Sequence, residues 1–180
     1  MLPRTSIGFG LAAALLLAAP GLAPSADAAT HSHATHETGP KKIGQYGDWI
    51  AATHQEAGQT VCYAFTRASS STPSMSGRGE VVLTVAERPS GRDAVAISAG
   101  FAYPANASVT VQVDQSSFDF YTAQRSAFAR DGHAAAMAFE RGARAIAKSP
   151  APRHGDVTDT FSLRGFTAAY QAINKACPAK

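Results

Sequence analysis

The stretch Val109-Thr110-Val111-Gln112-Val113 carries an apolar residue at every second position and a polar residue between them. Successive side chains of a β-strand point to opposite faces, so this alternation predicts a strand with one buried face and one exposed face. Outward from it, further segments rich in β-branched and aromatic residues recur, separated by turns that contain Pro, Gly or Asn. Short strands that follow one another without helices between them indicate antiparallel pairing in a sandwich or barrel.

The predicted strands share this alternation or a dense run of β-formers. We expect them over residues 46–53, 61–67, 80–87, 93–102, 109–113, 143–148 and 157–163, with Phe118 and Phe120 continuing the pattern after a tight turn. Within 61–67, Val61, Tyr63 and Phe65 are predicted on one face and Cys62 on the other. We expect a turn at 54–59, an exposed loop at 68–79 and a Pro-rich turn at 149–155.

Two helices are predicted in the C-terminal part. Asp131 is a suitable N-cap for a helix over 132–141, and Gly142 follows as a stop signal. A last helix is predicted over 164–176, with Ser162 as a candidate cap. Its apolar residues follow helical spacing and form one stripe: Phe166, Ala169, Tyr170, Ile173 and then Cys177. This stripe predicts that the helix packs on the sheet.

Cysteine usage adds a covalent constraint. The chain has two cysteines, Cys62 and Cys177, and an even count in an exported protein favours a disulfide. Two free thiols or an intermolecular bond are the alternatives. An intramolecular bond would fix the last helix to the second predicted strand.

The N-terminus has the features of a cleavable secretory signal peptide over residues 1–28. Arg4 gives a positive start, Ile7 to Ala19 are apolar, and Ala26-Asp27-Ala28 has the small-x-small pattern of a cleavage site. Residues 29–42 are predicted to be a disordered linker that contains histidines, and residues 43–180 a single domain. The apolar run is short for a membrane span, so we expect a protein that does not span the membrane.

The charge pattern argues against a nucleic-acid partner. The formal net charge is +3 and the isoelectric point is about 9.0. The basic residues are scattered, without a dense run and without interleaved aromatic residues of the kind that bind nucleic acids. We therefore interpret them as a solvated basic surface.

A search for chemistry finds no standard catalytic signature. The sequence has no G-x-S-x-G, S-x-x-K, H-E-x-x-H or C-x-x-C motif and no Walker motif. Carboxylates such as Glu87 and Asp159 are expected at strand edges or turns, and Trp49 is expected to be a core anchor rather than a ligand platform. We predict no catalytic residues, no cofactor and no enzyme activity.

Histidines give the one candidate for metal binding. His31, His33 and His36 have a spacing that could share a zinc or copper ion, but they lie in the predicted linker, so a solvated polar segment is the preferred interpretation and no metal site is assigned. His54 is expected in a turn and His154 in a loop, while His133 is expected at the start of a helix.

Several separated motifs resemble one family of exported bacterial proteins. In order they are Gly47-Asp48-Trp49, Val61-Cys62-Tyr63, Arg78-Gly79-Glu80-Val81, Arg88-Pro89, the stretch from Asp159 to Ala169, and Ile173-Asn174-Lys175-Ala176-Cys177. The stretch Ser162-Leu163-Arg164-Gly165-Phe166-Thr167-Ala168-Ala169 is similar to the SLxGFTAA signature of the invasion-associated locus B family. The resemblance covers residues 44–178 and indicates the branch with two cysteines.

The resemblance implies a periplasmic or envelope location, with association to the outer membrane left open, and a host-interaction role only through the family name. It supplies no catalytic residue or cofactor. We therefore expect a non-enzymatic binding or accessory module of the cell envelope whose protein partner is unknown, with the loops 68–79 and 149–155 as contact candidates. The alternative is a periplasmic protein that binds a small ligand or a metal. The sequence leaves the oligomeric state open.

Overall fold

The structure, a computed structural model, describes residues 39–152 and 155–179. The predicted signal peptide and most of the predicted linker, with His31, His33 and His36, lie outside these residues. The strands are β1 (Lys41–Tyr46), β2 (Trp49–Glu56), β3 (Gln59–Arg67), β4 (Ser70–Thr72), β5 (Val82–Arg88), β6 (Gly91–Ser98), β7 (Ser108–Val113), β8 (Ser116–Ala123), β9 (Ser126–Ala129), β10 (Arg144–Ala151) and β11 (Gly155–Ser162). The helices are α1 (Gly132–Arg141) and α2 (Phe166–Ala176).

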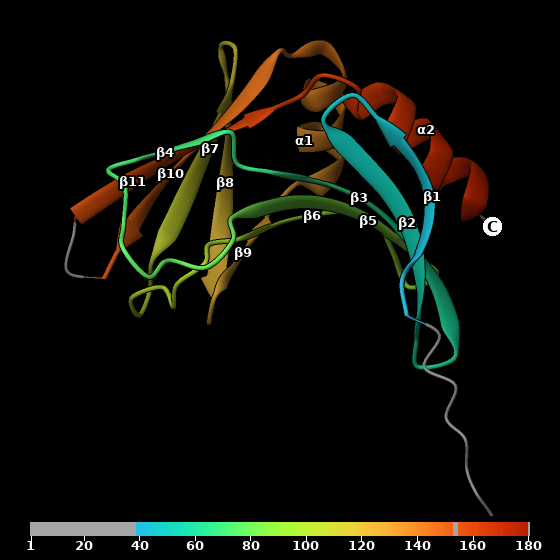
Figure 1. The fold of residues 1–180 in the computed structure, drawn as a ribbon, viewed down its shortest axis with the longest axis horizontal. Helices are drawn as coiled ribbons and strands as arrows, with labels where there is room; N and C mark the ends of the chain where they lie inside the picture. Colours follow the sequence, from blue (N-terminus) through green and yellow to red (C-terminus); the bar gives the residue numbers. More distant parts are fainter. Residues whose placement is uncertain (1–38, 153–154, 180) are drawn as a thin grey trace, which may run out of the picture. The chain divides into compact units, whose positions relative to one another are not determined.

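The strands form one antiparallel sheet in the order β1-β2-β3-β5-β6-β9-β8-β7-β10-β11-β4. β3 and β4 follow one another in the chain, yet they lie far apart in this order (Figure 1). At the switch, Ala68 N donates to Val81 O at 2.9 Å and Ser69 N donates to Thr160 O at 2.7 Å. The chain thus passes directly from one side of the sheet to its far edge and draws the two together. This confirms the predicted mainly β, barrel-like fold.

One face of the sheet carries the core. Val109, Val111 and Val113 are all buried, as their alternation predicts. Trp49 is fully buried, and its Nε1 donates to Ser162 O at 2.9 Å. The Phe166 ring of α2 lies 4.8 Å from the Trp49 ring, so the predicted core role of Trp49 is confirmed.

A further aromatic contact joins the two helices. The Phe139 ring of α1 lies 5.5 Å from the Phe166 ring, and both side chains are buried. Figure 1 shows α1 and α2 on the same side of β5 and β6. The helices therefore cover one face of this part of the sheet and leave the other face to the solvent.

The first helix has the predicted ends. Asp131 is the N-cap of α1, and its carboxylate accepts a hydrogen bond from Ala134 N at 2.9 Å. Gly142 follows the helix, and its N–H donates to Ala138 O at 2.9 Å.

The second helix starts differently from the prediction. The N-cap of α2 is Gly165, which has φ 92° and makes no side-chain cap. Ser162 is not the cap, because its hydroxyl donates to Asp48 Oδ2 at 2.7 Å and accepts at 3.3 Å from Arg164 N, which precedes the helix. A Cβ at Gly165 would collide with Tyr46 O, so this close passage of two backbone segments requires glycine.

The first predicted strand, 46–53, spans the last residue of β1, a turn at 47–48 and the first part of β2. Gly47 has φ +56° and turns the chain between β1 and β2, and a Cβ there would lie 2.6 Å from Arg164 O. Asp48 N donates to the same carbonyl at 3.1 Å. In the sequence, the only sign of this turn is Gly47 followed by Asp48. Because aromatic and apolar residues flank this pair, the whole segment resembles one continuous strand.

The domain also starts earlier than predicted. β1 begins at Lys41, inside the segment 29–42 that was expected to be linker. Lys41 and Lys42 of β1 are exposed, as residues of edge strands often are. The composition of the segment is therefore similar to that of a solvated linker.

Other boundaries shift for local reasons. β2 continues through His54 to Glu56, because the turn is made by Ala57 and Gly58, both at positive φ. β10 continues through Pro150. Proline has no backbone N–H, but the pairing of β10 with β7 already ends at Lys148, so no hydrogen bond to β7 is lost. β9 was not predicted; it has four residues and lacks a clear alternation.

The segment 68–79 is only partly the exposed loop that was predicted. Residues 70–72 form β4 and pair with β11, and the side chain of Arg78 is 5% exposed. A buried ion pair, described below, draws this segment onto the sheet.

The predicted disulfide is present. Cys62 on β3 is bonded to Cys177 directly after α2, with a Cα–Cα distance of 5.9 Å and a sequence separation of 115 residues. Cys62 is fully buried on the helix-facing side, and Tyr63 and Phe65 point the other way, as the alternation predicts.

We expect the double variant Cys62→Ala/Cys177→Ala to lower the free energy of unfolding by about 2–5 kcal/mol, because the bond closes a long loop of the unfolded chain. Urea denaturation followed by Trp49 fluorescence measures the change. An unfolding free energy equal to that of the oxidised wild type would contradict a stabilising role for the bond.

Candidate functional site

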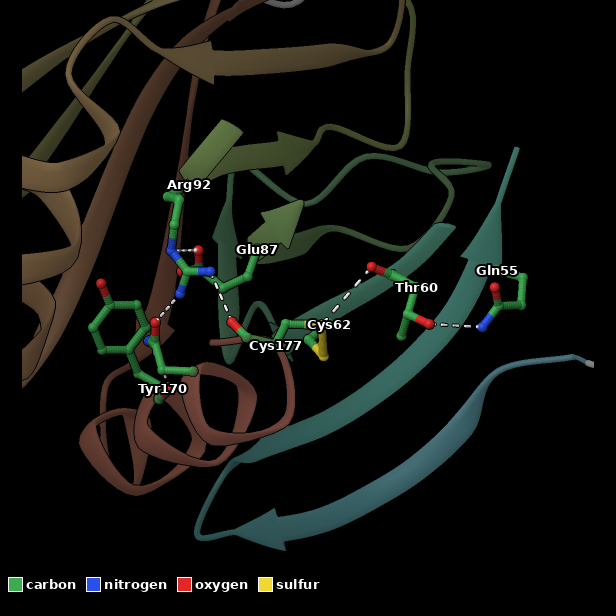
Figure 2. The surroundings of a disulfide bond; sticks show 8 residues. Gln55, Thr60, Cys62, Glu87, Arg92, Tyr170 and Cys177 are labelled. Atoms are coloured by element: carbon green, nitrogen blue, oxygen red, sulfur yellow. Dashed lines mark hydrogen bonds and ion pairs between the residues drawn. A yellow bond between two sulfur atoms is a disulfide. The ribbon is translucent and has the colours of Figure 1, made fainter. Parts of the chain in front are cut away.

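The densest cluster of polar side chains lies beside the disulfide, at the end of α2. Figure 2 shows Arg92 of β6 between Glu87 and Cys177. The Arg92 Nε lies 3.0 Å from Glu87 Oε2, and an Arg92 terminal nitrogen donates to Cys177 O at 2.7 Å. The other terminal nitrogen donates to Asn174 Oδ1 of α2. One guanidinium therefore ties the sheet to the last turn of α2.

Glu87 is the most unusual group in this cluster. It lies near the end of β5, as predicted, but its side chain is fully buried, which the sequence did not predict. Oε2 accepts from Asp93 N at 3.3 Å, whereas Oε1 has no hydrogen-bond partner among the residues the structure describes. Burial, together with the neighbouring Asp93 carboxyl, raises the pKa of Glu87 to about 7.

Asp93 links the cluster to both helices. Its carboxylate accepts hydrogen bonds from the Tyr170 hydroxyl of α2 and from His133 Nδ1 of α1, the latter at 2.7 Å. Burial acts to raise the pKa of Asp93, but these hydrogen bonds outweigh it and the net shift is downward. Its carbonyl packs against Gly132, where any Cβ would collide with it.

We call Glu87, Arg92, Asp93, His133 and Tyr170 the polar latch. The hydrogen bond to Asp93 raises the pKa of His133, and burial, with Asp93 close by, raises that of Tyr170. Each of these side chains forms a hydrogen bond or an ion pair with another member of the latch, so their polar groups bind one another. The arrangement holds α1 and α2 on the sheet.

A second buried polar group lies where the sheet closes. Both terminal nitrogens of Arg78 donate to the carboxylate of Asp159, each at 2.7 Å, and Arg78 Nε donates to Ala99 O at 2.7 Å. The exposed fractions of the two side chains are 5% and 2%. Asp159 lies in the middle of β11, so the predicted strand-end position is wrong. The Ser71 hydroxyl of β4 also donates to Asp159, at 2.6 Å.

The face of the sheet opposite the helices carries an aromatic strip on β2 and β3. We define the aromatic strip as His54, Tyr63, Phe65 and Arg67. The Tyr63 and Phe65 rings are 5.9 Å apart with an angle of 26° between their planes, and the His54 ring meets Tyr63 edge-on at 5.2 Å. The Arg67 guanidinium lies 6.0 Å from the centre of the Phe65 ring.

A hollow adjoins each end of the aromatic strip. One has a volume of about 400 Å³ and is lined by Phe65, Arg67, Ile50, Gln45 and Asp48, among others. The other, about 190 Å³, is lined by residues that include Val61, Glu56 and Arg88. This face therefore carries several exposed or half-buried side chains that a partner can contact while the domain stays folded.

The structure brings the two predicted cysteines together but does not gather the described histidines into one site. Cys62 and Cys177 form the disulfide, His54 lies in β2 and not in a turn, and His133 opens α1 as predicted. His154 lies outside the described residues. Within residues 39–152 and 155–179, no three His, Cys, Asp or Glu side chains are placed to hold a metal ion.

Sequence reasoning missed the polar latch and the aromatic strip. The strip had a signal, since Tyr63 and Phe65 stand opposite Cys62 in a strand whose cysteine was expected to face the core. The latch had none, because His133 and Tyr170 are distant in the sequence from the β5–β6 hairpin that carries Glu87 and Asp93.

Comparison with known proteins identifies the fold family. Residues 49–174 match the family model described as invasion associated locus B (IalB) protein. The chain belongs to the invasion associated locus B family. Its fold is similar to the crystal structure of invasion associated protein b from Bartonella henselae, with a TM-score of 0.55 and 17% sequence identity. That alignment covers 74% of this chain and 95% of the other.

At this identity the similarity to the Bartonella protein shows a shared fold and nothing about a shared site. No curated protein matches the sequence of this invasion associated locus B family member. In the part of the chain that the structure describes, neither helix is long and apolar enough to cross a membrane.

The polar latch predicts a stability that depends on pH. The pKa of Glu87 is raised in the folded state, so its contribution to stability is present at acidic pH and is lost as pH rises toward about 7. The raised pKa of His133 acts in the same direction. The lowered pKa of Asp93 acts oppositely, but only at pH values below its ordinary range. We expect the protein to be more stable at pH 5 than at pH 8.

Glu87→Gln keeps the shape of the side chain and cannot ionise. We expect it to reduce the stability difference between pH 5 and pH 8 by about 2 kcal/mol. Urea unfolding at both pH values measures this, with Glu80→Gln as the control, because Glu80 is an exposed glutamate paired only with Arg67. If Glu87→Gln and Glu80→Gln change the pH dependence equally, the latch is not its source.

The Arg78–Asp159 pair predicts strong non-additivity. Asp159→Asn removes the partner charge of a buried guanidinium, so we expect it to lower the free energy of unfolding by about 3–5 kcal/mol. The double variant Arg78→Met/Asp159→Leu leaves no buried charge and should recover much of this loss. Urea titration of both variants tests the prediction. A double variant no more stable than Asp159→Asn would contradict it.

Proposed function

We propose that this domain is a non-enzymatic binding module of the bacterial cell envelope that is exported to the periplasm. The single observation that carries the proposal is the aromatic strip on an uncovered face of a rigid sheet. Aromatic and arginine side chains are the residue types that contribute most of the binding energy at protein surfaces. The signal peptide expected from the sequence and the disulfide support a location outside the cytoplasm.

The distribution of ionisable groups supports a binding role over catalysis. Glu87 and Asp159 are buried and Asp93 is partly buried, and each carboxylate is held by neighbouring cations, hydroxyls or backbone N–H groups. A catalytic acid or base must reach a substrate in a plausible position, whereas these carboxylates are already bonded to protein groups. The loops 68–79 and 149–155 are weaker contact candidates than the strip, since Arg78 and Ser149 are buried.

Metal binding remains an alternative function only because of three histidines in the predicted linker. It rests on His31, His33 and His36, which lie outside the described residues, and the described residues offer no cluster to complete such a site. No observation in the folded domain favours this alternative.

The proposal is tested by cross-linking in living cells. A benzophenone amino acid that replaces Tyr63 should give a cross-linked product with one envelope component, because the residue lies in the aromatic strip. The matched control replaces Thr110, an exposed residue on β7 outside the strip. We expect the product only at position 63, and overexpressed wild-type protein should compete it away.

Absence of any specific product at Tyr63, at native expression and with a correctly formed disulfide, would contradict the proposed binding role of this face. An equal amount of cross-linked product at Thr110 would also contradict it.

A further inference from the structure

The larger hollow beside the aromatic strip combines an apolar floor with a polar rim. We propose that the outer face of β2 and β3 is a saccharide-binding site that takes a short run of an uncharged glycan chain. The inference rests on the proposed function as a binding module and adds the chemical class of its ligand.

The floor of the hollow suits one face of a sugar ring. Phe65 and Ile50 are both half-buried and both line the hollow of about 400 Å³. A pyranose presents a patch of C–H groups on one face, and the electron-rich face of an aromatic ring attracts such groups. Ligand sites are commonly hollows of this size with an apolar lining and a few polar groups that fix orientation.

The rim supplies both donors and acceptors. Gln45 Oε1 accepts from Lys42 Nζ at 3.2 Å, which leaves the Gln45 NH₂ group to donate. Arg67 uses its Nε on Glu80 at 2.7 Å, and its terminal nitrogens make no hydrogen bond to the residues described. The Ser69 hydroxyl, which donates to Thr160 O, keeps its acceptor lone pairs. Sugar hydroxyls donate and accept, so an amide, a guanidinium and a hydroxyl match them.

The charges on this face favour a ligand without net charge. Arg67 is paired with Glu80 at 2.7 Å, and Asp48 is paired with Arg164 at 2.7 Å. The hydrogen bonds from Arg164 and Ser162 lower the pKa of Asp48 to about 2, so it remains an acceptor at any physiological pH. Each charge that lines the hollow thus already has its counter-charge, and none is left to select a charged polymer.

The other end of the strip repeats the pattern. Arg88 Nε lies 3.1 Å from Glu56 Oε2, and both residues line the smaller hollow with Val61. Phe65 and Val61 are four residues apart on β3, which is roughly 14 Å along a strand. The Tyr63 ring lies between them, 5.9 Å from the Phe65 ring, a spacing comparable to the length of one sugar residue. The strip therefore suits several consecutive sugars and not a single one.

The test is a titration of the isotopically labelled mature protein, with its disulfide intact, by NMR. The probes are chitotetraose as an uncharged tetrasaccharide, tetragalacturonate as a charged one, and an uncharged extended peptide of similar length. We expect chitotetraose to shift the amide signals of β2 and β3 around Ile50, Tyr63 and Phe65, and to bind more tightly than the other two probes.

Three variants locate the site. Phe65→Ala should weaken chitotetraose binding roughly three- to tenfold, as expected for loss of an aromatic contact. Gln45→Ala tests the rim without changing the core, so it remains informative if Phe65→Ala fails to fold. The matched control is Tyr121→Ala, because Tyr121 is an exposed aromatic residue that stacks on Phe128 at 5.5 Å and lies beside Arg130. It should leave binding unchanged.

The outcomes separate this inference from the proposed function. No shift with chitotetraose, tighter binding of the peptide or of tetragalacturonate, or an equal effect of Tyr121→Ala would each overturn the saccharide site. If Tyr63 nevertheless cross-links to an envelope protein in cells, the binding module stands and its ligand is a protein. Binding of chitotetraose that is lost in Phe65→Ala and Gln45→Ala supports the site.

Discussion

The anchoring of α2 is the constraint on which the rest of the structure depends. The helix is held at its start by the contact of Phe166 with Trp49 and at its end by the bond from Cys177 to Cys62. Between these points, Ala169 and Ile173 are fully buried against the sheet. Because both ends are fixed, the helix covers the apolar face of the strands next to it, which an open antiparallel sheet would expose.

The Arg78–Asp159 pair and the polar latch both hold separate parts of the curved sheet and its helices together. The Arg78–Asp159 pair lies where β4 meets β11 and the chain switches across the sheet, and the polar latch lies where α1, α2 and the β5–β6 hairpin meet. Such groups stabilise less than a hydrophobic core of the same volume would, but they are directional. A guanidinium that must satisfy three acceptors permits one relative position of the segments that supply them, as Arg92 does for Glu87, Cys177 and Asn174.

How far the sequence predicts this structure depends on whether the signal is local. The alternation at Val109, Val111 and Val113 and the capping residues Asp131 and Gly142 each act within one element, and those elements form as expected. The pairing of Cys62 with Cys177 was predictable because only two cysteines are present. Asp159 was misplaced, since its partners Arg78 and Ser71 come from a segment that the sequence does not place beside β11.

The same distinction explains why the candidate binding face was hard to find. Tyr63 and Phe65 are aromatic residues of the kind that often fill a core, so their position opposite Cys62 was a weak signal. The structure shows that the core is on the side of Cys62 and Ala64. The helices, the disulfide and the buried ion pairs all lie on that side. The exposed side chains of the opposite face, such as Gln45 and Arg67, take no part in these contacts and can therefore vary with the ligand. A fold shared with a protein of 17% identity can then present different binding chemistry on the same strands.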